Sequence, residues 1–137
     1  MDISSKVERE VALLDENQSA LDAAGVMVER HIGSVVVTGA GIVKGIFTER
    51  DLLRVVAECR EPARLRLRDA MSTDLVHARP GDSVEYCLDL MRAHRVRHLL
   101  VFEGADFVGI VSLRDLVALM LEEKESLVAS LTSYITG

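Results

Sequence analysis

The hydrophobic pattern predicts two helices at equivalent places along the chain. In residues 19–31 apolar side chains recur at the spacing of one helix face, and they are Leu21, Ala24, Val28 and Ile32. Residues 83–94 repeat this spacing with Val84, Cys87, Leu88 and Met91. Met27 and Met91 hold equivalent positions in the two helices. We therefore expect both methionines in the core.

Short β-branched runs follow each of these helices. The runs are residues 34–38 and 42–47 in the first case, and residues 98–102 and 107–111 in the second. The residues between paired runs include glycine, which is typical of hairpins. A second helix is predicted from Thr48 and from Ser112, and apolar stretches at 11–14 and 75–77 predict one further strand each. The fold class is therefore α+β, with two β-α-β-β-α units, each a small mixed sheet with helices on one face.

The two units are copies of each other. Residues 19–58 align with residues 83–122 at an offset of 64 positions without a gap. Nine aligned positions are identical, and five of them lie within residues 45–52, so the similarity concentrates where a strand meets a helix. Two copies are too few for an open solenoid, which favours a closed pair that buries a shared face. We place the first copy at residues 1–62 and the second at residues 63–123.

Two segments lie outside the repeated pattern. Residues 59–68 contain Pro62 and four arginines, a composition typical of a solvated linker that follows the end of a helix. The last helix extends an apolar stripe through residues 124–137, where Leu127, Leu131 and Ile135 lie. This extension either folds back on its own domain or forms a surface for a partner, and the second alternative predicts a homodimer.

Composition excludes several classes of function. The net charge is −6, which argues against nucleic acid or an anionic membrane as the main partner. No apolar run has the ~18 residues of a membrane span, and the first residues do not resemble a signal peptide. Cys59 and Cys87 form no CxxC motif, so we expect no metal site or disulfide and a cytoplasmic location. No catalytic motif is present either, which predicts a protein that is not an enzyme.

The repeated segment Gly-Ile-x-Thr/Ser-x-x-Asp suggests a binding site. Thr48 and Ser112 each stand at the start of a helix, where unpaired amides and the helix dipole favour an anion such as phosphate. Asp51 and Asp115 follow one turn later, where a carboxylate can accept hydrogen bonds from a ribose diol. The two side chains are therefore candidates for binding the phosphate and the sugar of a nucleotide.

A purely structural role is the alternative. Thr48-x-x-Asp51 and Ser112-x-x-Asp115 also have the spacing of a capping box. The pairwise retention of Gly, Ile, Arg and Asp favours a ligand, because capping alone requires neither the glycine nor the arginine.

Five segments resemble those of cystathionine-beta-synthase (CBS) domains: residues 32–37, 45–51, 68–72, 97–101 and 109–115. The chain as a whole resembles a stand-alone tandem of these domains, a Bateman module. The resemblance implies a pseudo-twofold pair with two clefts between the copies. Such clefts bind AMP, ADP, ATP (with Mg²⁺) or S-adenosylmethionine.

The resemblance also implies roles for individual residues. Thr48 and Ser112 would contact phosphate, and Asp51 and Asp115 would hold the ribose hydroxyls. Further residues would line or border the sites, namely Ile32, Ser34, Arg97, His98, Ser72 and Thr73. The two sites are expected to differ, because residues 5–8 do not match the Asp-Ala-Met-Ser of residues 69–72. We favour the site of Ser112 and Asp115, where Arg95, Arg97 and His98 can meet phosphates.

The sequence therefore predicts a non-catalytic sensor of an adenosine nucleotide that acts on a partner protein or across a homodimer. The alternative is a dimeric interaction scaffold that binds no ligand and regulates a partner.

Overall fold

The computed structural model describes residues 1–136, which form two compact units. Residues 10–75 make up one unit, and residues 1–9 join residues 76 onward in the other. We refer to them as the 10–75 unit and the 76–136 unit. The division differs from the sequence repeats at 1–62 and 63–123. Ile3 is buried in the core of the 76–136 unit, whereas Leu65 and Leu67 are buried in the core of the 10–75 unit.

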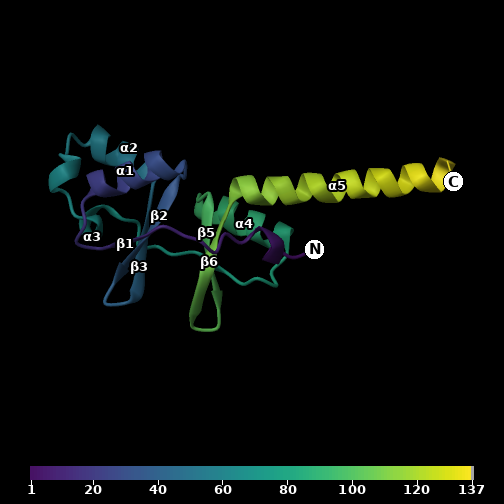
Figure 1. Ribbon diagram of the computed structural model, residues 1–137, viewed down its shortest axis with the longest axis horizontal. Coiled ribbons are helices and arrows are strands. Elements are labelled where there is room, and N and C mark those ends of the chain that lie inside the picture. Colours follow the sequence, from purple (N-terminus) through teal and green to yellow (C-terminus); the bar gives the residue numbers. More distant parts are fainter. Residues whose placement is uncertain (137) are drawn as a thin grey trace. The chain divides into compact units, whose positions relative to one another are not determined.

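The 10–75 unit is a three-stranded mixed sheet with helices (Figure 1). Strand β2 (Ser34–Gly39) lies between β1 (Leu13–Asp15), which is parallel to it, and β3 (Ile42–Thr48), which is antiparallel. The helices are α1 (Ala20–Arg30), α2 (Glu49–Ala57) and α3 (Leu67–Ala70), with a 3-10 turn at Pro62–Arg64. The buried side chains of β2 and the fully buried Phe47 of β3 pack with α1 in the core.

The 76–136 unit repeats this sheet with the same strand order and register. Strand β5 (His98–Glu103) pairs with β4 (His77–Ala78) and β6 (Asp106–Ser112). Its helices are α4 (Val84–His94) and α5 (Leu113–Thr136), and a 3-10 turn lies at Ser4–Lys6. Ser34 faces Thr48 in one hairpin and His98 faces Ser112 in the other, so the 64-residue offset also relates the strand registers. The predicted α+β class, the repeated unit and the long C-terminal helix are confirmed.

The strands expected at 11–14 and 75–77 form slightly later along the chain. Strand β1 ends at Asp15, whose carboxylate accepts a hydrogen bond from the Asn17 amide and so begins a turn. Strand β4 reaches Ala78, whose side chain is buried in the core. In both places the strand therefore stops where a turn begins, not where the apolar run stops.

Helix α1 buries a different face from the one suggested by its larger apolar residues. Ala20, Ala23 and Met27 are buried, whereas Leu21 and Val28 are exposed. The equivalent residues Val84, Cys87 and Met91 are the buried residues of α4, and the expectation that both methionines are core residues is confirmed. The inner face of α1 is therefore built mainly from alanines, and Leu21 and Val28 face away from the core.

The segment expected to be a solvated linker is a packed part of the 10–75 unit. Leu65 and Leu67 are buried, and their backbones bond to the segment before α1: Ala20 N–H donates to Leu65 O, and Leu67 N–H donates to Gln18 O, both at 2.8 Å. The arginines at 60, 64, 66 and 68 are exposed. Alternating Leu and Arg thus place one side of this segment in the core and the other in solvent.

Gly25 offers a simple test of the α1 assignment. It lies inside the helix, and a Cβ atom added there would meet no atom within 4 Å. Gly25→Ala is therefore expected to raise the free energy of unfolding by about 0.5–1 kcal/mol, because glycine loses more backbone entropy in a helix than alanine does. Urea unfolding followed by circular dichroism measures this. A loss of stability would mean that this stretch is not helical in solution.

Candidate functional site

Thr48 is the last residue of β3 and the N-cap of α2. Its amide donates to Asp51 Oδ2 at 2.9 Å, and the Asp51 amide donates to Thr48 Oγ1 at 3.3 Å. The Thr48 hydroxyl also donates to Asp51 Oδ2, at 3.1 Å. The pair thus forms a capping box, as in the structural alternative drawn from the sequence.

Asp51 is engaged on both of its carboxylate oxygens. Its Oδ1 atom accepts bonds from Arg54 Nη2 at 2.9 Å and from Ser72 Oγ at 2.8 Å, and the residue is only 3% exposed. Arg54 also donates to the Ala70 carbonyl at 3.2 Å, which joins α2 to α3. A ribose diol could bind Asp51 only by displacing donors that the protein itself supplies. Sequence reasoning missed Arg54, although its position three residues after Asp51 on one helix was a usable signal.

The start of α5 has the same cap with a different surrounding. The Ser112 amide and hydroxyl each donate to Asp115 Oδ2 at 2.9 Å, and the Asp115 amide donates to Ser112 Oγ at 3.1 Å. Ala118 occupies the position of Arg54 in the repeat. Glu8 occupies that of Ser72, because Glu8 pairs with Ile110 as Ser72 pairs with Ile46. Neither an alanine side chain nor an ionised carboxylate can donate a hydrogen bond to Asp115 Oδ1.

The first turns of both helices use their amides internally. Glu49 N–H donates to Gly33 O at 3.1 Å, and Leu113 N–H donates to Arg97 O at 2.8 Å. Together with the bonds from the Asp51 and Asp115 amides, two amides of each first turn are thus paired. This corrects the expectation of free amides awaiting a phosphate. An anion at either helix start would have to be held mainly by side chains.

The other predicted residues divide between the two units. Ser34 is buried opposite Thr48 in the hairpin, and Ser72 reaches Asp51, so these residues lie together. Ile32 packs against the core of the 10–75 unit, and Thr73 is exposed. In the 76–136 unit, His98 lies opposite Ser112 and the exposed Arg97 binds the start of α5 through its carbonyl.

The repeated glycine of the motif has a packing reason. A Cβ atom on Gly45 would lie 2.7 Å from the carbonyl oxygen of Ser72, and one on Gly109 would lie 2.2 Å from that of Glu8. In each unit a backbone segment crosses the strand at this point and pairs with the next residue, Ile46 or Ile110. The argument that the retained glycine favours a ligand is therefore wrong, because the close backbone approach alone requires it.

Among residues 1–136, no group of three or more His, Cys, Asp and Glu side chains is placed to hold a metal ion. No helix within that range is long and apolar enough to cross a membrane.

Comparison with known proteins identifies the family. The family model described as "CBS domain" matches residues 2–58 and 67–122. The CBS domain-containing protein YhcV of Bacillus subtilis (strain 168) is 34% identical over 115 residues, which cover 83% of this chain and 81% of that protein.

Solved structures agree with the sequence relatives. The CBS-domain containing protein ATU1752 from Agrobacterium tumefaciens has a TM-score of 0.79 and 33% identity, covering 85% of this chain and 88% of that one. The CBS domain protein PAE2072 from Pyrobaculum aerophilum, solved in complex with AMP, has a TM-score of 0.78 and 26% identity, covering 89% and 97%. With both copies matched by the family model and the fold shared over most of its length, the chain belongs to the CBS domain family as a tandem of two domains.

Proposed function

We propose that this protein is a non-catalytic regulatory module that binds an adenosine nucleotide at the start of α5. The observation that carries the proposal is the similarity to a CBS domain protein solved in complex with AMP, of which this chain covers 97%. Ser112 and Asp115 supply the hydroxyl and carboxylate that a nucleoside phosphate needs at a strand-to-helix junction.

Asp115 is the better ribose ligand of the two repeated aspartates. Both aspartates give Oδ2 to their own cap, but Oδ1 of Asp51 already accepts Arg54 and Ser72. At Asp115 those two donors are replaced by Ala118 and Glu8. The ribose hydroxyls can therefore donate to Asp115 Oδ1 without breaking a bond from Arg or Ser. At Asp51 they would compete with both.

The phosphate would be held by side chains beside Ser112. Arg95 and Arg97 are exposed in the turn that leads into β5, and His98 lies opposite Ser112 on that strand. Cations placed there form charge-assisted hydrogen bonds with a phosphate, which are stronger than neutral ones. If the ligand is ATP, Mg²⁺ would accompany its phosphates. Thr48, Asp51, Ile32, Ser34, Ser72 and Thr73 would form a second, weaker site.

Isothermal titration calorimetry with AMP, ADP, ATP plus magnesium, S-adenosylmethionine and GMP tests the proposal. We expect at least one adenosine ligand to bind and GMP not to bind. Asp115→Asn should weaken binding about 10- to 100-fold, equivalent to about 1–3 kcal/mol, because the amide loses the charge that strengthens the ribose bonds. Asp106→Asn is the matched control, since Asp106 is an exposed acid of the same unit at the hairpin turn.

Two results would count against the proposal. Unchanged affinity in a folded Asp115→Asn protein would exclude the ribose role of that carboxylate. No heat of binding with any adenosine ligand at millimolar concentration would favour the alternative, a dimeric scaffold that acts on a partner protein without a nucleotide.

A further inference from the structure

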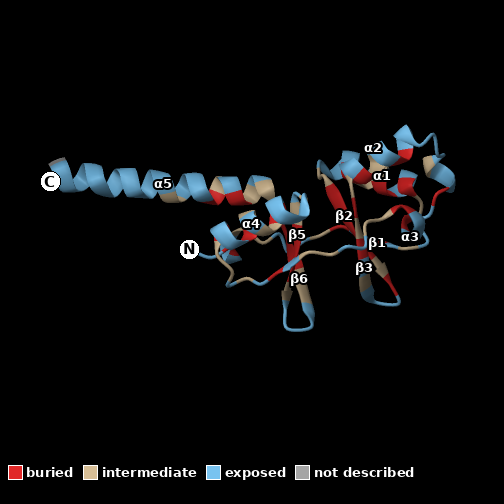
Figure 2. Cartoon of the chain, turned by 180° about the vertical axis from the view of Figure 1, so that it is seen from behind, coloured by how far each residue is buried: buried red, intermediate tan, exposed pale blue. Residues whose placement is uncertain are grey.

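Helix α5 carries an apolar stripe that its own unit does not cover. Leu116 and Leu119 are buried in the core, but the apolar residues beyond them on the helix are exposed. Leu127, Leu131 and Tyr134 are 60%, 53% and 87% exposed. The helix runs on past the rest of its unit and is pale blue along this outer part (Figures 1 and 2). The stripe therefore lies outside the core of its own unit.

The stripe has the spacing of a coiled coil. Its residues recur every seven positions in three columns: Val117, Lys124 and Leu131; Met120, Leu127 and Tyr134; Leu121, Val128 and Ile135. The first two columns alternate by three and four residues, as the a and d positions of a heptad do. Val117 to Tyr134 spans about 27 Å of helix. Such a face is typical of a helix that packs lengthwise against another helix.

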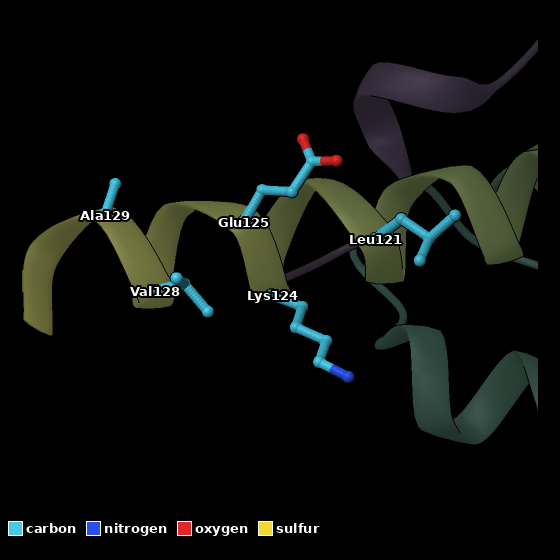
Figure 3. A pocket seen from close by; sticks show the side chains of 5 residues that line it. All are labelled: Leu121, Lys124, Glu125, Val128 and Ala129. Carbon is cyan, nitrogen blue, oxygen red and sulfur yellow. The ribbon is translucent and has the colours of Figure 1, made fainter. Parts of the chain in front are cut away.

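Lys124 is the one charged residue in the a and d columns, and its position indicates the partner's orientation. Figure 3 shows Lys124 and Val128 extending from one side of α5, and Glu125 and Ala129 from the other. Together with Leu121 these residues line a shallow hollow on the helix. A parallel pair of α5 helices in register would place the two Lys124 ammonium groups against each other. This arrangement is repulsive.

An antiparallel pair of α5 helices removes this conflict. With the twofold axis between Glu125 and Ser126, Lys124 of one chain faces Leu127 of the other, Met120 faces Leu131, and Val117 faces Tyr134. The stem of Lys124 can then pack on leucine while its ammonium group reaches solvent. The sequence of the helix is therefore complementary to itself in this direction.

We propose that two copies of this chain dimerise through antiparallel pairing of their α5 helices, with Lys124 opposite Leu127 of the other copy. The pairing does not depend on nucleotide binding. It buries the same residues on both copies, as a twofold-symmetric interface does.

Disulfide trapping tests the orientation. Met120→Cys and Leu131→Cys are each made in a Cys59→Ser background, because Cys59 is exposed. Cys87 can stay, since burial raises the pKa of its thiol to about 11 and keeps it protonated. In the antiparallel pair, two copies of residue 120 lie about 11 residues apart along the axis, roughly 16 Å, beyond disulfide reach. We expect neither single variant to cross-link alone, and a mixture of the two to form a disulfide-linked dimer after oxidation.

Each other outcome overturns the proposal. Cross-linking of each single variant with itself would indicate a parallel pair, and no cross-linking in the mixture would exclude the register. Light scattering gives a second measurement on the unmodified chain, where we expect twice the mass of one chain. Leu127→Asp should yield monomers, whereas Ser133→Asp, which adds the same charge outside the three apolar columns, should leave the dimer intact. A monomeric wild-type chain, or a dimeric Leu127→Asp variant, would contradict pairing through this stripe.

Discussion

Asp51→Ala is expected to lower the free energy of unfolding by about 2–4 kcal/mol, whereas Asp115→Ala should cost only about 1 kcal/mol. Both substitutions remove a capping carboxylate. Only the first also removes the acceptor of Arg54 and Ser72 inside a site where the carboxylate is nearly fully buried. Without Asp51, the Ser72 hydroxyl loses its acceptor and the contact between α2 and the segment after α3 is broken.

The chain contains no tryptophan, so urea unfolding is best followed by far-ultraviolet circular dichroism. Arg54→Ala separates the contributions, because it leaves the cap and the Ser72 bond in place. We expect a loss of about 1 kcal/mol for it, since the guanidinium is half exposed and the ion pair is partly screened by solvent. Equal losses for Asp51→Ala and Asp115→Ala would mean that Arg54 and Ser72 contribute nothing to stability.

The repeat made much of this fold predictable from the sequence. Hairpins, helix starts and caps depend on residues close in the chain, so a motif such as Thr48-x-x-Asp51 specifies its own local geometry. Because the motif recurs 64 residues later, one prediction could be checked against the other. The same locality explains why the capping box and the proposed ligand site could not be separated: the same two side chains serve both interpretations.

Contacts between segments distant in the sequence were not predictable in this way. Ile3 packs with residues beyond 76, and Leu67 packs with α1, although each lies in the half of the sequence assigned to the other copy. Nothing local marks such a pairing. The burial of Leu65 and Leu67 was also missed, because the arginines around them give the segment the average composition of a solvated linker. Such an average does not show that one side of the segment is apolar. The difference between Asp51 and Asp115 has the same origin, since Ser72 reaches Asp51 from a distant segment, whereas Glu8 takes the equivalent place beside Ile110.

Gly109→Ala should release the first residues of the chain from the 76–136 unit. The new Cβ atom would lie 2.2 Å from the Glu8 carbonyl oxygen, a backbone atom that cannot rotate away. Residues 7–9 would have to move, and the bonds Glu8 N–H to Ile110 O and Ile110 N–H to Glu8 O, at 2.8 and 3.0 Å, would break. We expect the free energy of unfolding to fall by about 2–3 kcal/mol.

Trypsin measures this release directly, because Lys6 and Arg9 lie in the affected segment. We expect cleavage there to be faster in Gly109→Ala than in the wild type. Gly81→Ala is the matched control, since a Cβ atom at that glycine of the same unit would meet nothing within 4 Å. If the substitution acts through the first residues, it should cost little in a chain that lacks residues 1–9, because the crossing backbone is then gone. An equal loss of stability in the full and shortened chains would instead place the clash within the sheet itself.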